Sequence, residues 1–370
     1  TTAECLCALT SGLAPGDRMK IEIISGLNRK APAAILLCAE GQRILLDAGG
    51  ALEPDEALWQ VPADIDAVLL SHDHADHIAG LNRLPREVPV YCSKVTAQAL
   101  PLGHNVRCID VRGTFRIGEI TVTTGSCGHA YGGVWFHLGI DGGVFYSGDI
   151  SMESALFHFD PPPPARIALV DASYGLYDVP QQQQLDKLWR YLLQPRLCPV
   201  PPSGRAVELA LLRARDNQPN IAMDESCRNM MEQMACQNDG SLRENVAAEL
   251  QSLAQVLPLF SIEAPLVLAS DPDGMSGMAG RLRERHDFHH RTLFTGHLNQ
   301  LSRQQWLAGD VDFCRWNVHP TLSCLKKLTT MLSCQYFAPL FTPLDYPAQW
   351  QQELQCEIIT SSTIEMELCQ

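Results

Sequence analysis

The chain has 370 residues and a formal net charge of −14, with 46% hydrophobic and 19% charged residues. This length suffices for two domains or for one core with a large insertion, and the composition is typical of a packed globular protein. The negative charge argues against a surface that binds nucleic acid throughout, so a nucleic-acid partner would have to contact a local basic patch.

The sequence contains no run of about eighteen apolar residues, which excludes an obvious membrane-spanning helix. Residues 1–7 lack the basic and then apolar pattern of a signal peptide, and we therefore expect a cytoplasmic protein. The 14 cysteines are scattered and mostly lie in apolar surroundings, which predicts reduced, buried thiols.

The N-terminal part predicts strands at 19–24, 34–38 and 42–46, and the third strand ends in Asp47-Ala48-Gly49-Gly50. An aspartate before glycine commonly closes a turn, but it can also orient a metal-binding histidine from behind. We favour the second role for Asp47 because of the segment that follows.

That segment begins with an apolar run at 67–70, which predicts a buried strand, and continues as Ser71-His72-Asp73-His74-Ala75-Asp76-His77 before a helical pattern that starts at Ile78. His72 and His74 are two residues apart, so a strand end can direct both imidazoles the same way. Asp76 and His77 can reach a second point nearby. The spacing suits two metal ions, and imidazoles with a carboxylate favour zinc. A histidine-rich surface loop is the alternative, which the flanking apolar strand disfavours.

Further strands are predicted at 88–92, 118–124, 132–138, 143–147 and 166–170, with a short helix at 93–100. The glycine-rich loop at 125–130 presents His129, which we expect to be the third nitrogen ligand rather than a solvated loop residue. Asp149 follows one strand end and could bridge two metals, and Asp171 follows another. Strands that end in Asp or His imply that these ends meet at one edge of a sheet.

After Gly175 the pattern changes. Predicted helices lie at 181–193, 205–214, 225–235 and 242–257, and a buried strand at 266–270 precedes a glycine-rich turn at 271–280. These elements indicate a small α/β unit of their own. The main sheet is expected to resume at 292–295 and to continue through 311–313, 316–319 and 336–341, with a helix at 322–332.

Taken in order, Asp47, the His72-x-His74-x-Asp76-His77 run, His129 and Asp149 resemble the metal-site motifs of the metallo-β-lactamase superfamily. The second half resembles its β-CASP branch, which processes nucleic acids. The similar segments are Asp171-Ala172-Ser173-Tyr174-Gly175, Gly204-Arg205-Ala206-Val207-Glu208-Leu209, Asp224-Glu225-Ser226, Ala269-Ser270 and Leu293-Phe294-Thr295-Gly296-His297. The resemblance implies a four-layer αββα fold with an inserted α/β cap domain. The implied divisions are 1–175, the cap at 176–294, and 295–370, which completes the first domain.

The resemblance also implies roles for individual residues. One zinc ion would be held by His72, His74 and His129, with Asp149 bridging to a second ion held by Asp76 and His77. The catalytic residues would be Asp76, Asp171 and His319, with His319 hydrogen-bonded to Asp171 near the scissile phosphate. The residues expected to contact substrate are Arg205, Ser270 and His297. For Arg205, a salt bridge within the cap is the alternative to a phosphate contact.

The C-terminal part departs from the family pattern. RNA-cleaving members end the next strand with a histidine that binds the second metal, whereas this segment reads Tyr336-Phe337-Ala338-Pro339-Leu340-Phe341-Thr342. DNA-processing members carry an apolar residue there. Either one zinc ion suffices in this chain, or His297 substitutes as a ligand.

The expected function is a zinc-dependent hydrolase, a phosphodiesterase or nuclease that cleaves RNA or DNA with a metal-bound hydroxide. A hydrolase of small esters from the same superfamily and a non-catalytic scaffold subunit are the alternatives. The sequence leaves open RNA against DNA, endo- against exonucleolytic cleavage, and whether the chain acts alone, as a homodimer or with protein partners. The His286-Asp287-Phe288-His289-His290 segment predicts a solvated hinge rather than another metal site.

Overall fold

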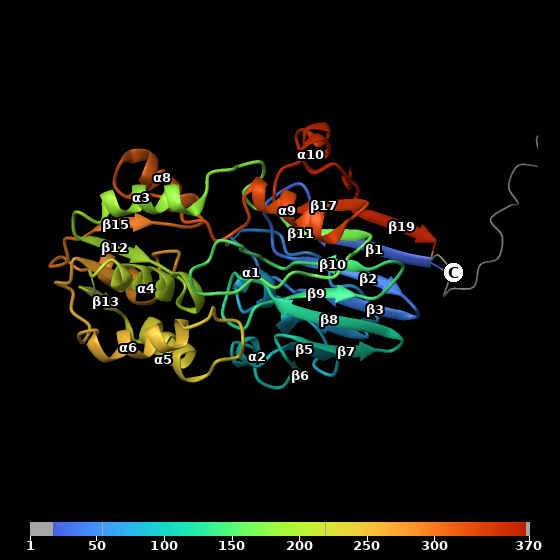
Figure 1. Cartoon of the computed structure of the whole chain (residues 1–370), viewed down its shortest axis with the longest axis horizontal. Coiled ribbons are helices and arrows are strands. Elements are labelled where there is room, and N and C mark those ends of the chain that lie inside the picture. Colours follow the sequence, from blue (N-terminus) through green and yellow to red (C-terminus); the bar gives the residue numbers. More distant parts are fainter. Residues whose placement is uncertain (1–17, 54, 219, 368–370) are drawn as a thin grey trace, which may run out of the picture.

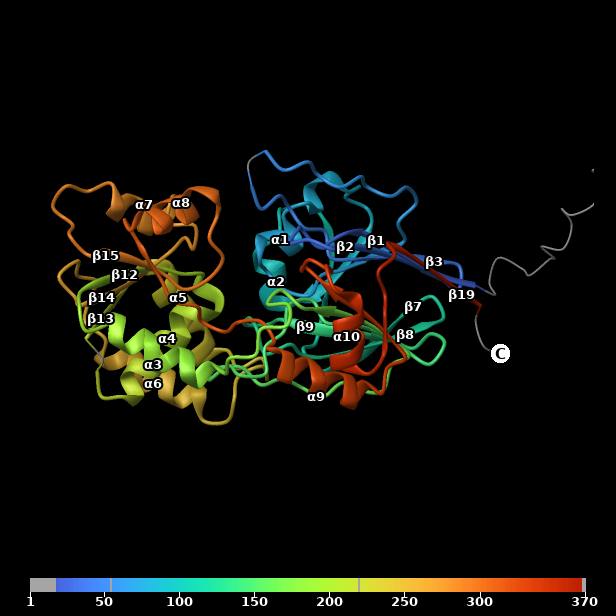
Figure 2. The same cartoon turned by 90° about the horizontal axis from the view of Figure 1, so that it is seen from above.

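The computed structural model describes residues 18–53, 55–218 and 220–367, which form two lobes (Figures 1 and 2). The larger lobe contains two seven-stranded sheets with the strand orders β19-β1-β2-β3-β4-β5-β6 and β18-β17-β11-β10-β9-β8-β7. The strands of the first sheet are β1 (Arg18–Ser25), β2 (Ala34–Ala39), β3 (Gln42–Leu46), β4 (Ala67–Leu69), β5 (Pro89–Ser93), β6 (Asn105–Ile109) and β19 (Thr363–Glu367). Those of the second are β7 (Gly113–Ile117), β8 (Ile120–Ser126), β9 (Val134–Leu138), β10 (Val144–Tyr146), β11 (Ile167–Asp171), β17 (Tyr336–Leu340) and β18 (Glu357–Ile358).

Apolar side chains explain why these two sheets form the centre of the lobe. Alternate residues of the first sheet, such as Ile21 and Ile35, pack against Val122 and Phe136 of the second sheet and are buried. The outer face of the first sheet packs against α1 (Ala75–Ile78) and η1 (Leu81–Arg83), with α2 (Lys94–Gln98) following β5. The outer face of the second sheet packs against α9 (Leu322–Leu332) and α10 (Pro347–Leu354). The expected αββα layering is therefore confirmed.

The smaller lobe is built on a five-stranded parallel sheet in the order β13-β14-β12-β15-β16. Its strands are β12 (Arg196–Pro199), β13 (Ile221–Met223), β14 (Leu266–Ala269), β15 (Arg291–Phe294) and β16 (Asp312–Phe313). The surrounding helices are α3 (Gln181–Tyr191), η2 (Pro202–Ala206), α4 (Val207–Arg215), α5 (Glu225–Cys236), α6 (Val246–Val256), α7 (Gly277–Arg283) and α8 (Gln300–Ala308). Figure 2 shows α3, α4 and α6 on one side of the sheet and α7 with α8 on the other. Of the described helices, none has both the length and the hydrophobicity needed to cross a bilayer.

The prediction that the main sheet resumes at 292–295 is wrong. β15 pairs with β12 and with β16, so both strands belong to the smaller lobe, and 316–319 forms no strand. The second sheet resumes only at β17, beside β11. An apolar run predicts a buried strand but does not specify which sheet it joins, because that depends on long-range pairing. We therefore propose that the inserted cap domain extends beyond residue 294, through β16.

The helix near the predicted metal ligands also differs from the expectation. The sequence predicts a helix from Ile78 onward, whereas α1 starts at Ala75, directly after His74, and ends at Ile78. His77 therefore lies on the helix, where its backbone N–H donates to the carbonyl of His74 (2.9 Å). The sequence does not predict this helix because it is short and partly polar, whereas a helical hydrophobic period can be recognised only over a longer apolar pattern. The turn predicted at 271–280 likewise contains the start of α7.

The buried cysteines are consistent with the predicted thiols. Cys92, Cys127 and Cys198 are free and buried, and burial raises the pKa of each to about 12. A thiol with such a pKa stays protonated near neutral pH and reacts slowly as a nucleophile or metal ligand. These three cysteines therefore act as small apolar core residues.

We predict that Asp224→Asn lowers the free energy of unfolding by about 1 kcal/mol at pH 7, because Asp224 is the N-cap of α5. Its carboxylate accepts hydrogen bonds from Cys227 N (2.9 Å), Ser270 N (2.8 Å) and Ser270 Oγ (2.7 Å). Burial alone would raise the pKa of Asp224, but these hydrogen bonds lower it overall. The carboxylate therefore stabilises the fold above its unfolded pKa of about 4, and this contribution is lost as the pH falls towards the lower folded value.

Urea denaturation at pH 7 and at about pH 3 would measure the difference between the wild type and the variant. Ser93→Ala serves as the control, because the Ser93 hydroxyl caps α2 by accepting from Thr96 N (3.2 Å) and does not titrate. The Ser93 effect should be the same at both pH values. An Asp224→Asn effect that is equally large at both would contradict the assignment.

Candidate metal centre

The predicted ligands converge at one edge of the larger lobe because several strands of the two facing sheets end there. His72 and His74 follow β4 of the first sheet, whereas His129 follows β8 and Asp149 follows β10 of the second. Gly148 has φ of +55°, and a Cβ there would lie 2.4 Å from the Cβ of Ser71, so glycine lets the loop carrying Asp149 approach the histidine loop.

Three groups of side chains in the described residues have their potential ligand atoms within 4.8 Å of one another. All three include Asp149. They are His72, His74, His129 and Asp149; then Asp76, His77 and Asp149; and finally Asp149, Asp171 and His319. The structure thus brings together every residue that the sequence analysis assigned to a metal, and it adds the Asp171–His319 pair to the same cluster.

Hydrogen bonds fix the tautomers of two histidines of the first group, His129 and His72. His129 Nδ1 donates to the carbonyl oxygen of Val318 (2.5 Å), which can only accept, so Nε2 keeps its lone pair. Ser71 Oγ donates to Asp47 (2.7 Å) and therefore accepts from His72 Nδ1 (3.0 Å), which leaves the lone pair on His72 Nε2. These two Nε2 atoms lie 3.6 Å and 3.8 Å from Asp149 Oδ2. Both histidines therefore direct their unprotonated nitrogen at the same carboxylate.

Asp47 holds the third histidine of the motif. Its Oδ2 accepts from His77 Nδ1 (2.7 Å) and from the hydroxyl of Tyr146 (2.6 Å), and Ser71 N donates to Oδ1 (2.7 Å). His77 Nε2 then faces Asp149 Oδ1 at 3.2 Å. The geometry matches the orienting role proposed for Asp47, since a carboxylate behind a histidine fixes its ring and its tautomer.

His319 lies beside the same cluster. Its Nδ1 is 2.7 Å from Asp171 Oδ2 and 3.7 Å from Asp149 Oδ2. Asp171 also accepts from Ser173 N (2.9 Å) and Ser173 Oγ (2.7 Å), so its buried carboxylate is fully engaged. The hydrogen bond between His319 and Asp171 implied by the resemblance is present, although 316–319 is loop rather than strand.

The chemistry of this cluster fits a metal ion. His72 Nε2 is buried and has no hydrogen-bond partner, which is costly unless an ion occupies the space that it faces. Burial lowers the pKa of His72 and of His129 well below the usual range, so both imidazoles stay neutral and can act as ligands. Burial would raise the pKa of Asp149, but the nearby His77 and His319 lower it well below its usual range. Neutral imidazoles around an ionised carboxylate form a donor set that suits zinc.

The second group differs from the first because Lys30 and Phe341 lie beside it. Lys30 Nζ is 3.4 Å from Asp76 Oδ2, and the Phe341 ring packs against His77 with centroids 5.7 Å apart. Burial lowers the pKa of Lys30, but Asp76, Asp149 and Asp171 raise it overall. The sequence analysis missed Lys30, since a lysine in a loop carries no motif. His297, whose substitution for the missing histidine was one of two alternatives, belongs to none of the three groups found among the described residues.

The other residues expected to contact substrate have different surroundings. Arg205 is buried in η2, its Nε has no hydrogen-bond partner, and it makes no ion pair with any described carboxylate. Its guanidinium lies against Gly296, where a Cβ would be 2.2 Å from Nη1. Ser270 hydrogen-bonds to Asp224 and to Ser226 Oγ (2.8 Å), so it supports the start of α5. The salt bridge considered for Arg205 is therefore not seen.

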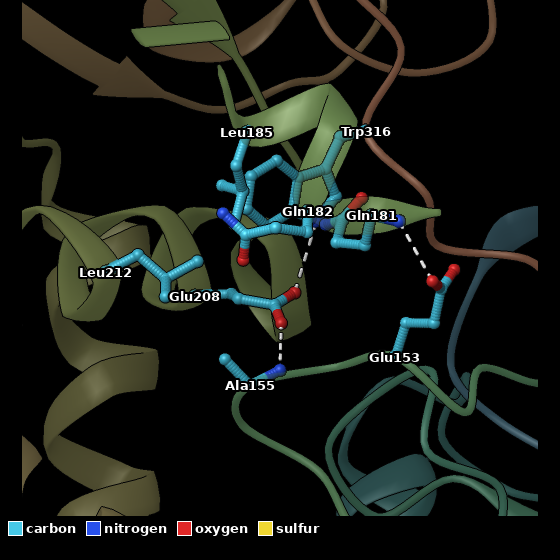
Figure 3. A pocket seen from close by; sticks show the side chains of 8 residues that line it. All are labelled: Glu153, Ala155, Gln181, Gln182, Leu185, Glu208, Leu212 and Trp316. Atoms are coloured by element: carbon cyan, nitrogen blue, oxygen red, sulfur yellow. Dashed lines mark hydrogen bonds between the residues drawn. The ribbon is translucent and has the colours of Figure 1, made fainter. Parts of the chain in front are cut away.

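A cleft of about 490 Å³ connects the metal ligands to the cap. His74 lines one wall, and Ser203, Met230 and Asp273 line the other. Ser203 Oγ lies 3.3 Å from Asp73 Oδ1 and 3.5 Å from His74 Nε2, so the cap contacts the motif directly. A second cavity of about 300 Å³ lies beside Glu208 and Trp316 and contains none of the proposed metal ligands (Figure 3).

Comparison with known proteins identifies the family of the segment that carries most of the cluster. Residues 42–176 match the family model described as "Beta-lactamase superfamily domain", and this segment contains the whole His72–Asp171 part of the cluster. Residues 42–176 therefore form a domain of the β-lactamase superfamily. Members of this superfamily are metal-dependent hydrolases, and the inserted cap and the order of the motifs resemble those of its β-CASP branch.

Several curated proteins are similar to parts of this chain. Ribonuclease TTHA0252 from Thermus thermophilus is 29% identical over 42% of this chain and 44% of its own length. Transcription termination factor FttA from Methanocaldococcus jannaschii is 26% identical over 52% of this chain and 39% of its own length. FttA from Methanococcus maripaludis is 29% identical over 46% of this chain and 35% of its own length. The matched parts are thus less than half of each relative.

A solved structure supports the fold over nearly the whole chain. The crystal structure of a protein of unknown function from Enterococcus faecalis V583 covers 95% of this chain, and the match includes 100% of that protein. The TM-score is 0.63 and the sequence identity is 15%. At this identity the likeness supports the shared architecture alone.

We predict that His72→Ala and His74→Ala each abolish tight zinc binding, because each removes a nitrogen donor from the first group. Zinc per chain would be measured by inductively coupled plasma mass spectrometry on freshly purified protein. His286→Ala is the control, since His286 is exposed and belongs to none of the three groups. Wild-type zinc content in the His72 variant would contradict the assignment of this group.

Proposed function

We propose that the chain is a zinc-dependent phosphodiesterase that cleaves RNA or DNA. The observation that carries the proposal is that the hydrogen-bonded pair of His319 and Asp171 lies beside Asp149, a proposed metal ligand. A site that only bound a metal would not need the further imidazole of His319, which Asp171 orients and whose Nδ1 lies 3.7 Å from Asp149 Oδ2. General acid catalysis requires such a group beside the reacting centre.

In this proposal some residues bind the metal ion and others transfer the proton. Zinc, when bound, would supply an acidified water and polarise a phosphate oxygen. His72, His74, His129 and Asp149 would hold the ion. In the imidazolium form of His319, Nδ1 donates to Asp171 and Nε2 carries the proton that would pass to the leaving oxygen. Asp76 would act in the second group of potential ligands, which shares Asp149 with the first group.

Aromatic and cationic side chains support a nucleic-acid substrate beside this site. The Tyr174 ring lies 5.2 Å from the His319 ring, and the Arg315 guanidinium lies 4.4 Å from the Tyr174 ring and 4.7 Å from the Tyr177 ring. Aromatic and guanidinium planes of this kind can stack with bases or contact phosphates. This local arrangement supplies the cationic contact that a chain with a net charge of −14 needs.

The similar proteins add support of a different kind. One of them is named a ribonuclease and others are named transcription termination factors. The acidic net charge is the observation that favours the rival function, a hydrolase of small esters. A scaffold subunit is the remaining alternative, and freshly purified protein without tightly bound zinc would support it.

Cleavage assays can separate these functions. The zinc-loaded protein would be incubated with labelled single-stranded RNA, single-stranded DNA and a small ester, at about 50 and 200 mM salt. A nuclease should cleave a nucleic acid and lose activity steeply at the higher salt, because phosphate contacts release counterions. Turnover of the ester alone, insensitive to salt, would overturn the nuclease proposal.

We predict that His319→Ala lowers kcat for nucleic-acid cleavage by about a hundredfold or more, through loss of the general acid. Zinc content should stay at the wild-type level, because His72, His74 and His129 remain. Asp171→Asn should give a smaller loss, since His319 remains but is no longer held by a carboxylate. The measurement is single-turnover cleavage together with metal analysis. A His319→Ala variant with wild-type kcat would contradict the proposed role.

A further inference from the structure

The loop between β1 and β2 brings a lysine to the second group of potential ligands. Lys30 Nζ lies 3.4 Å from Asp76 Oδ2, and the Lys30 side chain is 27% exposed. Among the described residues, Asp76 is the only side chain that accepts a hydrogen bond from this ammonium. Lys30 therefore faces the cluster of Asp76, His77 and Asp149 rather than bulk solvent alone.

The backbone holds this loop firmly in place. Ala33 N donates to the carbonyl oxygen of Asp76 (2.8 Å), and Gly49 N donates to the carbonyl oxygen of Ala33 (2.8 Å). A Cβ at Gly49 would lie 1.9 Å from the Asp76 oxygen, so only glycine permits this packing. The segment that carries Lys30 is thus bonded to the backbone of the residue with which its side chain pairs.

An apolar side chain closes the other side of the same group. The Phe341 ring lies 5.7 Å from the His77 ring, and Lys30 Nζ lies 5.3 Å from the Phe341 ring centroid. Phe341 N donates to the carbonyl oxygen of Gly26 (2.6 Å), and a Cβ at Gly26 would lie 2.7 Å from Phe341 Cε1. The end of β17 and the lysine loop are therefore packed together. Phe341 offers no ligand atom, and the ammonium lies over its ring.

We propose that the Lys30 ammonium takes the place of the second metal ion, so that the chain binds one zinc ion and uses Lys30 as its second positive charge. This inference rests on the proposed phosphodiesterase function for the role of that charge. Lys30, held by Asp76, would stabilise negative charge on a non-bridging phosphate oxygen, as cationic groups do in phosphoryl transfer. The ammonium would also repel a divalent cation from the second group, and Phe341 leaves that group with one ligand fewer.

Metal stoichiometry tests the first half of this inference without any activity assay. Zinc per chain would be measured by titration with zinc alone and by mass spectrometry for the wild type, Lys30→Met, Phe341→His and the double variant. The wild type should bind about one tight zinc ion. The double variant, which loses the repelling charge and gains a ligand, should bind about two. Two tight zinc ions in the wild type would overturn the inference.

Catalysis tests the second half. Lys30→Met should lower kcat about a hundredfold while keeping one zinc ion, and Lys30→Arg should retain more of the activity. Lys327→Met is the control, because Lys327 is exposed on α9. If the zinc-loaded wild type cleaves no phosphodiester, the proposed function fails, whereas the stoichiometry still decides whether Lys30 replaces a metal. Unchanged kcat in Lys30→Met would refute the catalytic role.

Discussion

The buried carboxylate of Asp47 is the group on which the arrangement of the site depends. A buried charge is tolerated only when it is fully hydrogen-bonded, and Asp47 meets this demand by accepting from Ser71, His77 and Tyr146. Ser71 follows β4 and His77 lies on α1, whereas Tyr146 ends β10 of the opposite sheet. One carboxylate therefore ties the two sheets and the helix together. It also sets the direction of the His77 ring.

The requirement that buried polar groups be hydrogen-bonded also explains how the histidines are oriented towards the proposed metal site. Each proposed nitrogen ligand whose tautomer can be assigned donates through Nδ1 to a group of the protein, and its Nε2 faces Asp149. The acceptors differ, since His77 uses a carboxylate, His129 a backbone carbonyl and His72 a hydroxyl. The shared outcome is that protein hydrogen bonds satisfy Nδ1 and direct Nε2 at Asp149. The fold thus prepares the site before a metal binds.

The parts of this site that the sequence could predict are those governed by short-range order. His72, His74 and His77 share one strand-to-helix junction, so their convergence follows from local geometry, and His129, Asp149 and Asp171 each lie at or just after a strand. Other features depend on contacts between distant segments. Lys30 is 46 residues from Asp76, and no periodicity reports their pairing. The placement of β15 and β16 in the cap was mispredicted for the same reason, since strand partners are chosen by tertiary packing.

The first and second groups of potential ligands lie on different kinds of secondary structure, and this difference affects what each group can bind. His72, His74 and His129 follow strands of the two facing sheets, and two of them are locked by buried hydrogen bonds. Asp76 and His77 instead lie on a four-residue helix whose surroundings are a lysine loop and an aromatic ring. A divalent ion needs several donor atoms in fixed positions, whereas an ammonium needs only one carboxylate and tolerates an aromatic neighbour. The first group therefore offers three imidazoles to a metal, whereas the second group offers one imidazole beside a lysine and an aromatic ring.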